Sequence, residues 1–201
     1  NRSYFIKGMK KLYYDNDSDN WYDKNLLRTI VDRLKMPDYQ LKSNFLAIFS
    51  ILSFQVYDNI YKKRNIKLSF RSNPFFHGKP WFDWCISTWI NDNINADLNH
   101  TTSTDLCPTQ ILMFINPSIM EFEVDNIESK KGSLWAVVRC AVPITSKKEI
   151  KVREHFILSK SYKVENQIRI IDCDNIVEDC FVIANIDHLI DNKENPSMNA
   201  M

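Results

Sequence analysis

The sequence predicts a mainly β fold: a partly open β-barrel with one helix packed on its outside near the N-terminus. Side chains from Phe82 to Trp89 fall into two alternating sets, and this period of two is typical of a strand. Short apolar runs separated by polar turns recur through the second half of the chain, as they do in barrels and sandwiches. One stretch near the N-terminus instead has the apolar spacing of a helix.

That helix belongs to an N-terminal segment, residues 1–42. The residues of this segment that precede the helix form a polar and aromatic approach segment. The apolar residues that fall on one helical stripe are Leu26, Leu27, Ile30, Val31 and Leu34. Asp23 is placed to cap the start of the helix, and Pro37 ends it. We therefore predict a helix near Lys24–Met36.

The predicted barrel occupies residues 43–190. Aromatic and β-branched residues are frequent from Phe45 to Tyr57, which predicts one long strand or two short ones, with a buried helix as the alternative. The polar residues 62–65 predict a turn, and Ile66–Phe70 starts another strand.

Two loops and a series of short strands are expected after that. Residues 73–80 contain two prolines and a glycine, and residues 91–105 are rich in asparagine and threonine, so both predict loops. The tail, residues 191–201, is polar and is expected to be loose. The short apolar runs predicted as strands are Ile111–Ile115, Phe122–Val124, Leu134–Val142, His155–Leu158, Gln167–Ile171 and Cys180–Ile186.

Composition excludes several classes of protein. The chain has 201 residues and 44% hydrophobic residues, enough for a core, but a formal net charge of only +1, so any contact with nucleic acid must come from a local patch. Its three glycines cannot form a phosphate loop, which excludes nucleotide-loop enzymes and predicts no small-molecule cofactor. No apolar run reaches the ~20 residues that span a bilayer, so no membrane partner is expected.

The cysteines indicate a reducing environment rather than a metal site. Their odd number and wide spacing predict buried free thiols, and zinc sites usually contain a Cys-x-x-Cys pair that is absent here. We therefore expect no metal and an intracellular location, with the nucleus as one candidate compartment. The five cysteines are Cys85, Cys107, Cys140, Cys173 and Cys180.

An aromatic cluster is the strongest local feature. Rings interspersed with cations can stack on bases or form a cage for a methylated ammonium group, although a loop packed by its own aromatics needs no ligand. Asp83 is expected to accept hydrogen bonds from nearby backbone or from Arg71. The candidate ligand- or peptide-binding residues are Phe75, Phe76, Trp81 and Trp84.

Two basic clusters are candidate nucleic-acid contacts, with solvated turns as the alternative interpretation. The first cluster is Lys62, Lys63, Arg64, Lys67 and Arg71. The second cluster is Lys147, Lys148, Lys151 and Arg153.

One group of carboxylates is a candidate for catalysis. If Asp172 and Asp174 lie on one strand, their side chains share a face, and with Glu178 and Asp179 they could hold magnesium. No basic or nucleophilic partner accompanies them, so an acidic strand end is the favoured interpretation and no enzyme activity is predicted.

Part of the aromatic region resembles a segment near the C-terminus of transposon-encoded proteins of fungi and protists. In that segment an Arg-x-x-Pro stretch, a glycine and an aromatic-Asp-aromatic strand precede two apolar strands. The matching residues here are Arg71, Pro74, Gly78, Pro80, Trp81, Phe82, Asp83 and Trp84, then Ile111–Ile115 and 135–138. The resemblance implies an accessory C-terminal module, with the catalytic acids of a transposase upstream of this chain.

The C-terminal third is similar to the end of a bromo-adjacent homology domain. That family closes with an acidic-apolar-apolar-Leu-Ser strand, here Glu154 to Ser159, and an Ile…Cys-x-Val strand, here Ile176, Cys180 and Val182. The resemblance implies a β-barrel that contacts chromatin or proteins. The methyl-lysine readers of the family use an aromatic cage, whose residues cannot be placed one by one here.

Three functions follow in order of preference. The first is a non-catalytic interaction module that binds a protein tail, a partner subunit or chromatin. The second is an accessory DNA-binding domain of a transposase-like protein that uses the two basic clusters. The third is an enzyme fragment built on the carboxylates at 172–179. The chain begins at Asn1 rather than at a methionine, so we expect it to be an excerpt of a longer protein.

Overall fold

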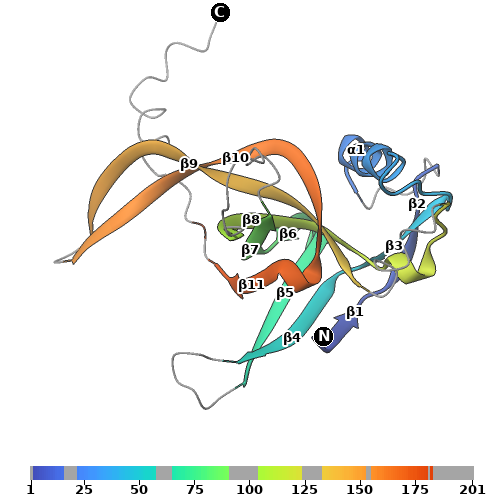
Figure 1. Cartoon of the computed structure of the whole chain (residues 1–201), viewed down its shortest axis with the longest axis horizontal. Coiled ribbons are helices and arrows are strands. Elements are labelled where there is room, and N and C mark those ends of the chain that lie inside the picture. The colour runs from blue at the N-terminus through green and yellow to red at the C-terminus, as the bar shows by residue number, and fades with distance from the viewer. Residues whose placement is uncertain are drawn as a thin grey trace, which may run out of the picture. The chain divides into compact units, whose positions relative to one another are not determined.

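The computed structural model describes residues 2–15, 22–57, 65–90, 104–123, 133–152, 155–180 and 182, and these residues are mainly β (Figure 1). The chain divides into two compact units. The first unit is Asn1–Val142 with Val164–Cys180, and the second is Pro143–Lys163 with Phe181–Met201. Two long strands, β9 (Trp135–Val152) and β10 (His155–Asp172), contribute residues to both units.

The first unit contains a four-stranded sheet in the order β1-β4-β5-β6, with every neighbouring pair antiparallel. Its strands are β1 (Tyr4–Lys7), β4 (Ile51–Tyr57), β5 (Asn65–Phe76) and β6 (Lys79–Phe82).

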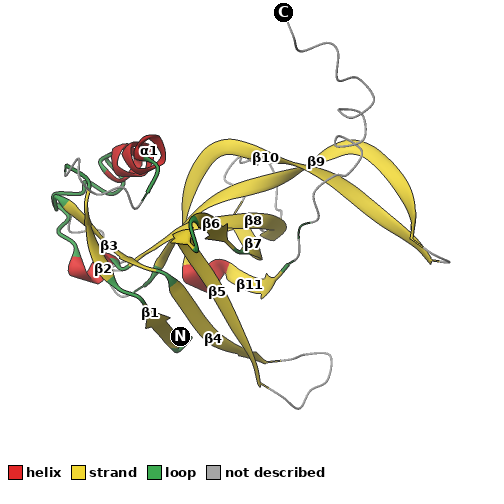
Figure 2. Ribbon diagram, turned by 180° about the vertical axis from the view of Figure 1, so that it is seen from behind, coloured by secondary structure: helices red, strands yellow, loops and turns green. Residues whose placement is uncertain are grey.

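A second sheet has the order β10-β9-β8-β3-β2, and β7 pairs with both β8 and β11. Figure 2 shows these strands in yellow with the short 3-10 turns η1 (Pro117–Ile119) and η3 (Cys173–Asn175) in red. The remaining strands are β2 (Lys10–Tyr13), β3 (Phe45–Phe49), β7 (Trp84–Ile90), β8 (Thr104–Ile115) and β11 (Ile176–Asp179).

The chain passes between the two sheets at single-residue bends. Ser50, between β3 and β4, donates its N–H to the Lys7 carbonyl, and its own carbonyl accepts the N–H of Ser72. Asp83, between β6 and β7, donates its N–H to the Arg71 carbonyl and accepts the N–H of Ile111. Each bend therefore uses both backbone groups to join neighbouring strands, as at the corners of packed sheets.

Two buried clusters fill the first unit. One lies under the helix α1 (Lys24–Leu34), whose buried residues pack with those of β2, β3 and β8. The other joins the inner face of the four-stranded sheet to β7, β8 and β9, and contains the stacked rings of Phe49 and Phe114 with centroids 5.1 Å apart. Each fully buried large apolar side chain contributes about 1.5–3 kcal/mol.

The helix starts where its sequence pattern predicts. The Asp23 carboxylate accepts the N–H of Leu26 at 2.8 Å, and the helix buries Leu27, Ile30, Val31 and Leu34. Pro37 lies three residues beyond its last residue, Leu34. The predicted position of this helix outside a barrel stays a prediction.

Several predicted elements differ from those observed. The approach segment contains strands β1 and β2, which are too short for a period to show in the sequence. The predicted loop at 73–80 is a hairpin of β5 and β6, turned by His77 and Gly78 with φ of 50° and 79°. Two positive φ angles are typical of the tight type I′ hairpin turn. Pro74 is tolerated in β5 because the register shifts between Asn73 and Phe76.

The strands of the second half are longer than predicted. The runs at 155–158 and 167–171 belong to one strand, β10, because the polar residues between them also pair in the sheet. Phe122 makes only an isolated bridge with Leu41. The described strands form two sheets and no closed barrel. The predicted turn at 62–64, most of the predicted loop at 91–105 and the run from 183 to 186 lie outside the described residues.

Replacing Gly8 tests the bend between β1 and β2. Gly8 has φ +69°, and an added Cβ would lie 2.2 Å from Ser50 Oγ and 3.3 Å from Ser50 Cβ. Gly78 has φ +79° but no neighbour within 4 Å of such a Cβ. Gly78→Ala should lower the free energy of unfolding by about 1–2 kcal/mol, from backbone strain alone. Gly8→Ala should cost roughly 1–3 kcal/mol more, because it also overpacks the bend.

The measurement is urea unfolding of both variants under identical conditions. Adding Ser50→Ala to Gly8→Ala removes the nearest atom and should recover part of the loss. Equal destabilisation by the two glycine substitutions would show that the bend at Gly8 is not close-packed.

Candidate basic–aromatic face

The four-stranded sheet has one face in the core and an outer face on which Phe5, Lys67 and Trp81 are exposed, although Ser53 on β4 is buried. Leu52, Phe54, Leu68 and Phe70 alternate inward along β4 and β5 and lie in the core. The intervening positions form the other face, where Phe5 pairs with Ser53, Ser53 with Ser69, and Ile51 with both Lys7 and Arg71. We call the residues Phe5, Lys7, Lys67, Arg71 and Trp81 the basic–aromatic face.

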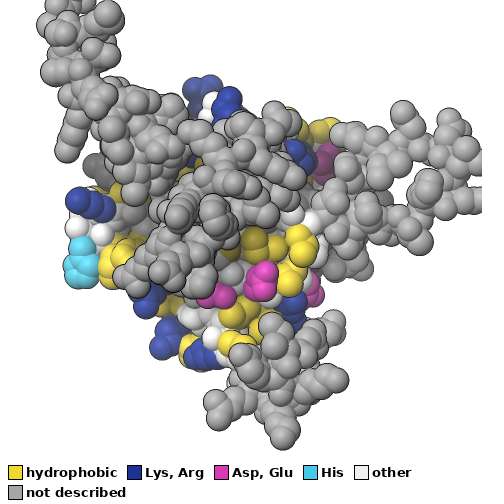
Figure 3. All heavy atoms as spheres, turned by 90° about the vertical axis from the view of Figure 1, so that its left-hand side faces the viewer, with side chains coloured by type: hydrophobic (Ala, Val, Ile, Leu, Met, Phe, Trp, Pro, Cys, Tyr) yellow, Lys and Arg dark blue, Asp and Glu magenta, His cyan; other side chains and the backbone are white. Residues whose placement is uncertain are grey.

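Charge is strongly segregated on these strands. The sequences of β1, β4, β5 and β6 contain four Lys or Arg residues and no Asp or Glu. The whole chain, by contrast, has 26 basic and 25 acidic residues. Apart from the Asp83 carboxylate at its edge, the sheet is therefore a local positive patch on a nearly neutral protein. In Figure 3, Lys and Arg side chains lie beside hydrophobic side chains on the described surface, and Asp and Glu side chains are visible in the same view.

Phe5 lies between two of the cations on this face. The residue is 54% exposed, and the ammonium groups of Lys7 and Lys67 lie 5.3 and 5.7 Å from the centroid of its ring. Two cations from different strands thus flank one exposed ring. Because no acidic side chain on the sheet offsets them, an anion placed beside this ring would be attracted by both.

Trp81 is exposed but held in a fixed orientation. Its indole Nε1 donates a hydrogen bond to Asp83 Oδ1 at 2.7 Å, and 45% of the residue remains accessible. The backbone N–H of Arg71 donates to Asp83 Oδ2, also at 2.7 Å, as the sequence predicted for Asp83. The Arg71 guanidinium lies 5.9 Å from the Trp81 ring centroid. The bend residue Asp83 therefore also positions this ring.

The four predicted ligand-binding aromatics occupy different environments. Phe75 is 60% exposed, whereas Phe76 is half-buried and packs edge-on against Trp81 with centroids 5.3 Å apart. Trp84 is half-buried and belongs to β7 of the other sheet. The Phe76 and Trp81 rings touch one another and do not stand as separate walls of a cage.

The predicted basic clusters are placed only in part. Lys67 and Arg71 share the basic–aromatic face, whereas 62–64 and Arg153 lie outside the described residues. Lys147, Lys148 and Lys151 belong to β9 within the second unit, and their side chains lie outside the described ones. Phe5 and Lys7 were missed by the sequence reasoning, although Tyr4–Lys7 alternates between half-buried and exposed side chains as a strand does.

The carboxylates considered as a magnesium site from the sequence make structural hydrogen bonds at Asp172 and Asp174. Asp172 ends β10 and accepts the N–H of Asp174 at 2.8 Å, which caps the turn η3. Asp174 accepts the Tyr4 hydroxyl, and Glu178 and Asp179 are exposed on β11. The expectation that Asp172 and Asp174 share a strand face is wrong, because the strand ends at Asp172. Among the described residues no group of three or more His, Cys, Asp or Glu side chains could hold a metal ion.

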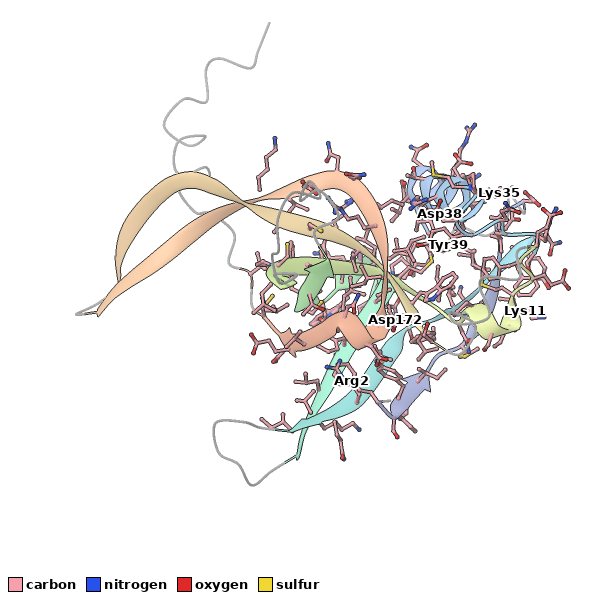
Figure 4. The ribbon with its side chains drawn as sticks, viewed as in Figure 1. Arg2, Lys11, Lys35, Asp38, Tyr39 and Asp172 are labelled. Carbon is pink, nitrogen blue, oxygen red and sulfur yellow. The ribbon has the colours of Figure 1, made fainter. Side chains whose placement is uncertain are left out.

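Contacts between a cation and an aromatic ring also occur outside the basic–aromatic face. Figure 4 labels Arg2, Lys11 and Lys35, whose charged groups lie 4.9, 4.4 and 5.0 Å from the ring centroids of Phe54, Phe45 and Tyr14. Those three rings are buried or half-buried, so each cation packs over a ring at the edge of the hydrophobic core. Phe5 differs because its ring is exposed and contacts two cations.

An open hollow of about 330 Å³ lies elsewhere, after the end of α1. Lys42 and Glu123, which both line it, form an ion pair of 2.8 Å. Lys35 also lines it and leaves the lining with a formal charge of +1, but no aromatic side chain lines it, so the hollow lacks the combination of ring and cations that the basic–aromatic face has.

The Asp83–Trp81 contact can be measured by a double-mutant cycle. Asp83→Ala removes the acceptor of both the Arg71 N–H and the Trp81 indole, and should lower the free energy of unfolding by about 1–3 kcal/mol. In a Trp81→Phe background the loss should be smaller by about 0.5–1.5 kcal/mol, because the indole N–H is already gone. Asp179→Ala on exposed β11 is the matched control and should change stability by less than about 0.5 kcal/mol. Strict additivity of Asp83→Ala and Trp81→Phe would show that the two side chains are not coupled.

Comparison of the chain with protein-family models, curated proteins and solved structures gave no match. None of the described helices is both long and apolar enough to cross a membrane.

Proposed function

We propose that this chain is a non-catalytic binding module that holds a single-stranded nucleic acid on its basic–aromatic face. The observation that carries the proposal is Phe5, a residue that is 54% exposed and whose ring is flanked by the ammonium groups of Lys7 and Lys67. The absence of acidic residues from the four strands of this sheet supports it.

The chemistry of such a face suits an unpaired strand. Exposed rings on a sheet stack on splayed bases, while nearby cations neutralise the phosphates that link them. The bases of a duplex are already stacked on one another, so exposed rings add little binding free energy when the ligand is a duplex. Phe5 and Trp81 lie on the two edge strands of the four-stranded sheet, so a bound strand would run across β4 and β5 between them.

The two rings are far enough apart to act on different nucleotides. Three strand spacings of about 4.8 Å and four residues along β5 at ~3.3 Å each separate them by roughly 20 Å. This span fits binding sites of four or more nucleotides, such as those of other sheet-based binders. Because the chain is nearly neutral overall, the affinity should be weak at physiological salt.

A second candidate is a protein tail as ligand, and it rests on Phe75. This side chain is 60% exposed beside Phe76, and a large exposed ring is frequent in protein interfaces. We also keep two expectations from the sequence as proposals. The first is that the fold is a partly open barrel of the bromo-adjacent homology type, and the second is that the chain derives from a transposon-encoded protein. A protein ligand would depend on Phe75 and would be insensitive to Lys7 and Lys67.

The test is a fluorescence anisotropy titration with a labelled single-stranded oligonucleotide of about 12 nucleotides and with the matching duplex. Phe5→Ala should weaken binding of the single strand by about 1–3 kcal/mol, and Phe5→Leu should weaken it similarly, since neither side chain stacks. Phe5→Trp should retain binding. The double variant Lys7→Ala with Lys67→Ala should reduce the salt slope by roughly 0.7 for each lost phosphate contact.

Arg28 provides the control for charge, because its exposed side chain lies on α1 and pairs with Asp32 at 4.0 Å. Arg28→Ala should leave the affinity and the salt slope unchanged. If the lysine double variant and Arg28→Ala bind equally well, the face does not contact phosphates. If Phe75→Ala alone abolishes binding of a peptide ligand, the protein-tail function replaces this one.

A further inference from the structure

A row of three residues crosses the outer side of the four-stranded sheet. Phe5 of β1 pairs with Ser53 of β4, and Ser53 pairs with Ser69 of β5. Directly opposed residues of an antiparallel sheet have Cβ atoms about 4.5–5.5 Å apart, so the two serines lie side by side with Phe5 at the end of the row. The row therefore combines one aromatic ring with two hydroxyl groups.

The two hydroxyl groups have different roles. Ser53 is 3% exposed, and its Oγ donates a hydrogen bond to Ser69 Oγ at 2.9 Å. Ser69 itself is exposed. A serine hydroxyl has one hydrogen to donate, and because Ser69 accepts the hydrogen of Ser53, its own hydrogen is directed away from Ser53. The exposed Ser69 hydroxyl thus presents a hydrogen-bond donor to a ligand on this side of the sheet.

Two ammonium groups reach this row from opposite directions. Lys7 lies two residues from Phe5 on one side of the row, and Lys67 lies two residues from Ser69 on the other side. Their Nζ atoms lie 5.3 and 5.7 Å from the centroid of the Phe5 ring, so both side chains lean toward the row. No ion pair between described residues involves either lysine.

We propose that Ser69, Lys7 and Lys67 form a binding site for one phosphate group beside the Phe5 ring. The Ser69 hydroxyl donates to a phosphate oxygen, and the two ammonium groups offset the negative charge from both sides of the row. The site rests on the proposed function and deepens it, because the phosphate is one that belongs to the nucleotide stacked on Phe5.

Phosphate suits this site better than a carboxylate does. A phosphate has several oxygens arranged around one atom, so it can accept hydrogen bonds from a hydroxyl and from ammonium groups on two sides at once. Carboxylates are recognised best by the planar fork of an arginine. The guanidinium of this face, on Arg71, lies 5.9 Å from the Trp81 ring centroid instead.

The Ser69 hydroxyl gives the site a defined position, which charge alone does not. A lysine holds a phosphate as a point charge, and contacts of that kind let a protein slide along a nucleic acid. A hydroxyl on a paired strand has a fixed place, and the hydrogen bond from the buried Ser53 restricts its direction further. Ser69 therefore determines which phosphate of the bound strand lies next to Phe5.

Substitution of Ser69 separates the hydroxyl from the charges. Ser69→Ala should weaken binding of the labelled single-stranded oligonucleotide about 10-fold, because a hydrogen bond to a charged group is lost. The salt slope should stay unchanged, in contrast to the double variant Lys7→Ala with Lys67→Ala. Ser69→Thr keeps the hydroxyl on a residue that strands favour and should bind as wild type. Ser118→Ala, at an exposed serine of η1, is the matched control and should also bind as wild type.

Two further variants exclude an effect of folding. Ser69→Ala leaves the buried Ser53 hydroxyl without its acceptor, whereas the double variant Ser53→Ala with Ser69→Ala removes both groups. This double variant should bind as weakly as Ser69→Ala. Ser53→Ala alone keeps the donor and should retain most of the affinity. Wild-type affinity in both Ser69→Ala and the serine double variant would overturn the site and leave the proposed function standing.

Inorganic phosphate tests the site without an oligonucleotide. Isotope-labelled full chain is titrated with sodium phosphate at constant ionic strength, and the amide signals of Phe5, Lys7, Lys67 and Ser69 should shift while those of α1 do not. If phosphate shifts these signals and no oligonucleotide binds, the site holds a free phosphate and the proposed function is wrong. If the oligonucleotide binds but phosphate moves no signal of the row, the phosphate site is wrong.

Discussion

The backbone hydrogen bonds at Ser50 and Asp83 hold the two sheets together, and most other features depend on them. Each residue bends a strand out of one sheet and uses its N–H and carbonyl to join strands on both sides of the bend. A buried bend without such partners would leave polar groups unsatisfied at a cost of about 1–3 kcal/mol each. The small residue Gly8, packed on Ser50, allows the neighbouring passage from β1 to β2. The arrangement gives both sheets a shared core without closing them into a barrel.

These bends also determine which side chains reach solvent together. Because Asp83 interrupts the run from Lys79 to Ile90, Trp81 belongs to the four-stranded sheet and Cys85 belongs to the other. The Asp83 carboxylate then fixes the Trp81 indole at the edge of the basic–aromatic face. On the opposite edge, Phe5 is placed by its pairing with Ser53. The proposed recognition of nucleic acid therefore uses a face assembled from segments far apart in the sequence.

Sequence reasoning found the features that depend on local pattern. The Asp23 cap, the stripe from Leu27 to Leu34 and the acceptor role of Asp83 are visible in neighbouring residues and are present in the structure. Strands β1 and β2 were missed because four residues are too few to show a period, and their pairing with β4 and β3 is non-local. Lys67, Arg71 and Trp81 belong to local clusters of charge or aromatic residues and were therefore candidates from the sequence. Phe5 and Lys7 were not, because β1 joins the sheet only through its non-local pairing with β4.

Chemical-shift mapping tests the central claim most directly, because it reports the bound surface without any substitution. Isotope-labelled protein is titrated with a short single-stranded oligonucleotide at low salt, and the backbone amide and Trp81 indole signals are followed. If the basic–aromatic face binds the strand, the largest shifts occur at Phe5–Lys7, Lys67–Arg71 and the Trp81 indole, and α1 is unaffected. Shifts confined to α1 and the hollow beside Lys42, or no shifts at saturating oligonucleotide, would contradict it.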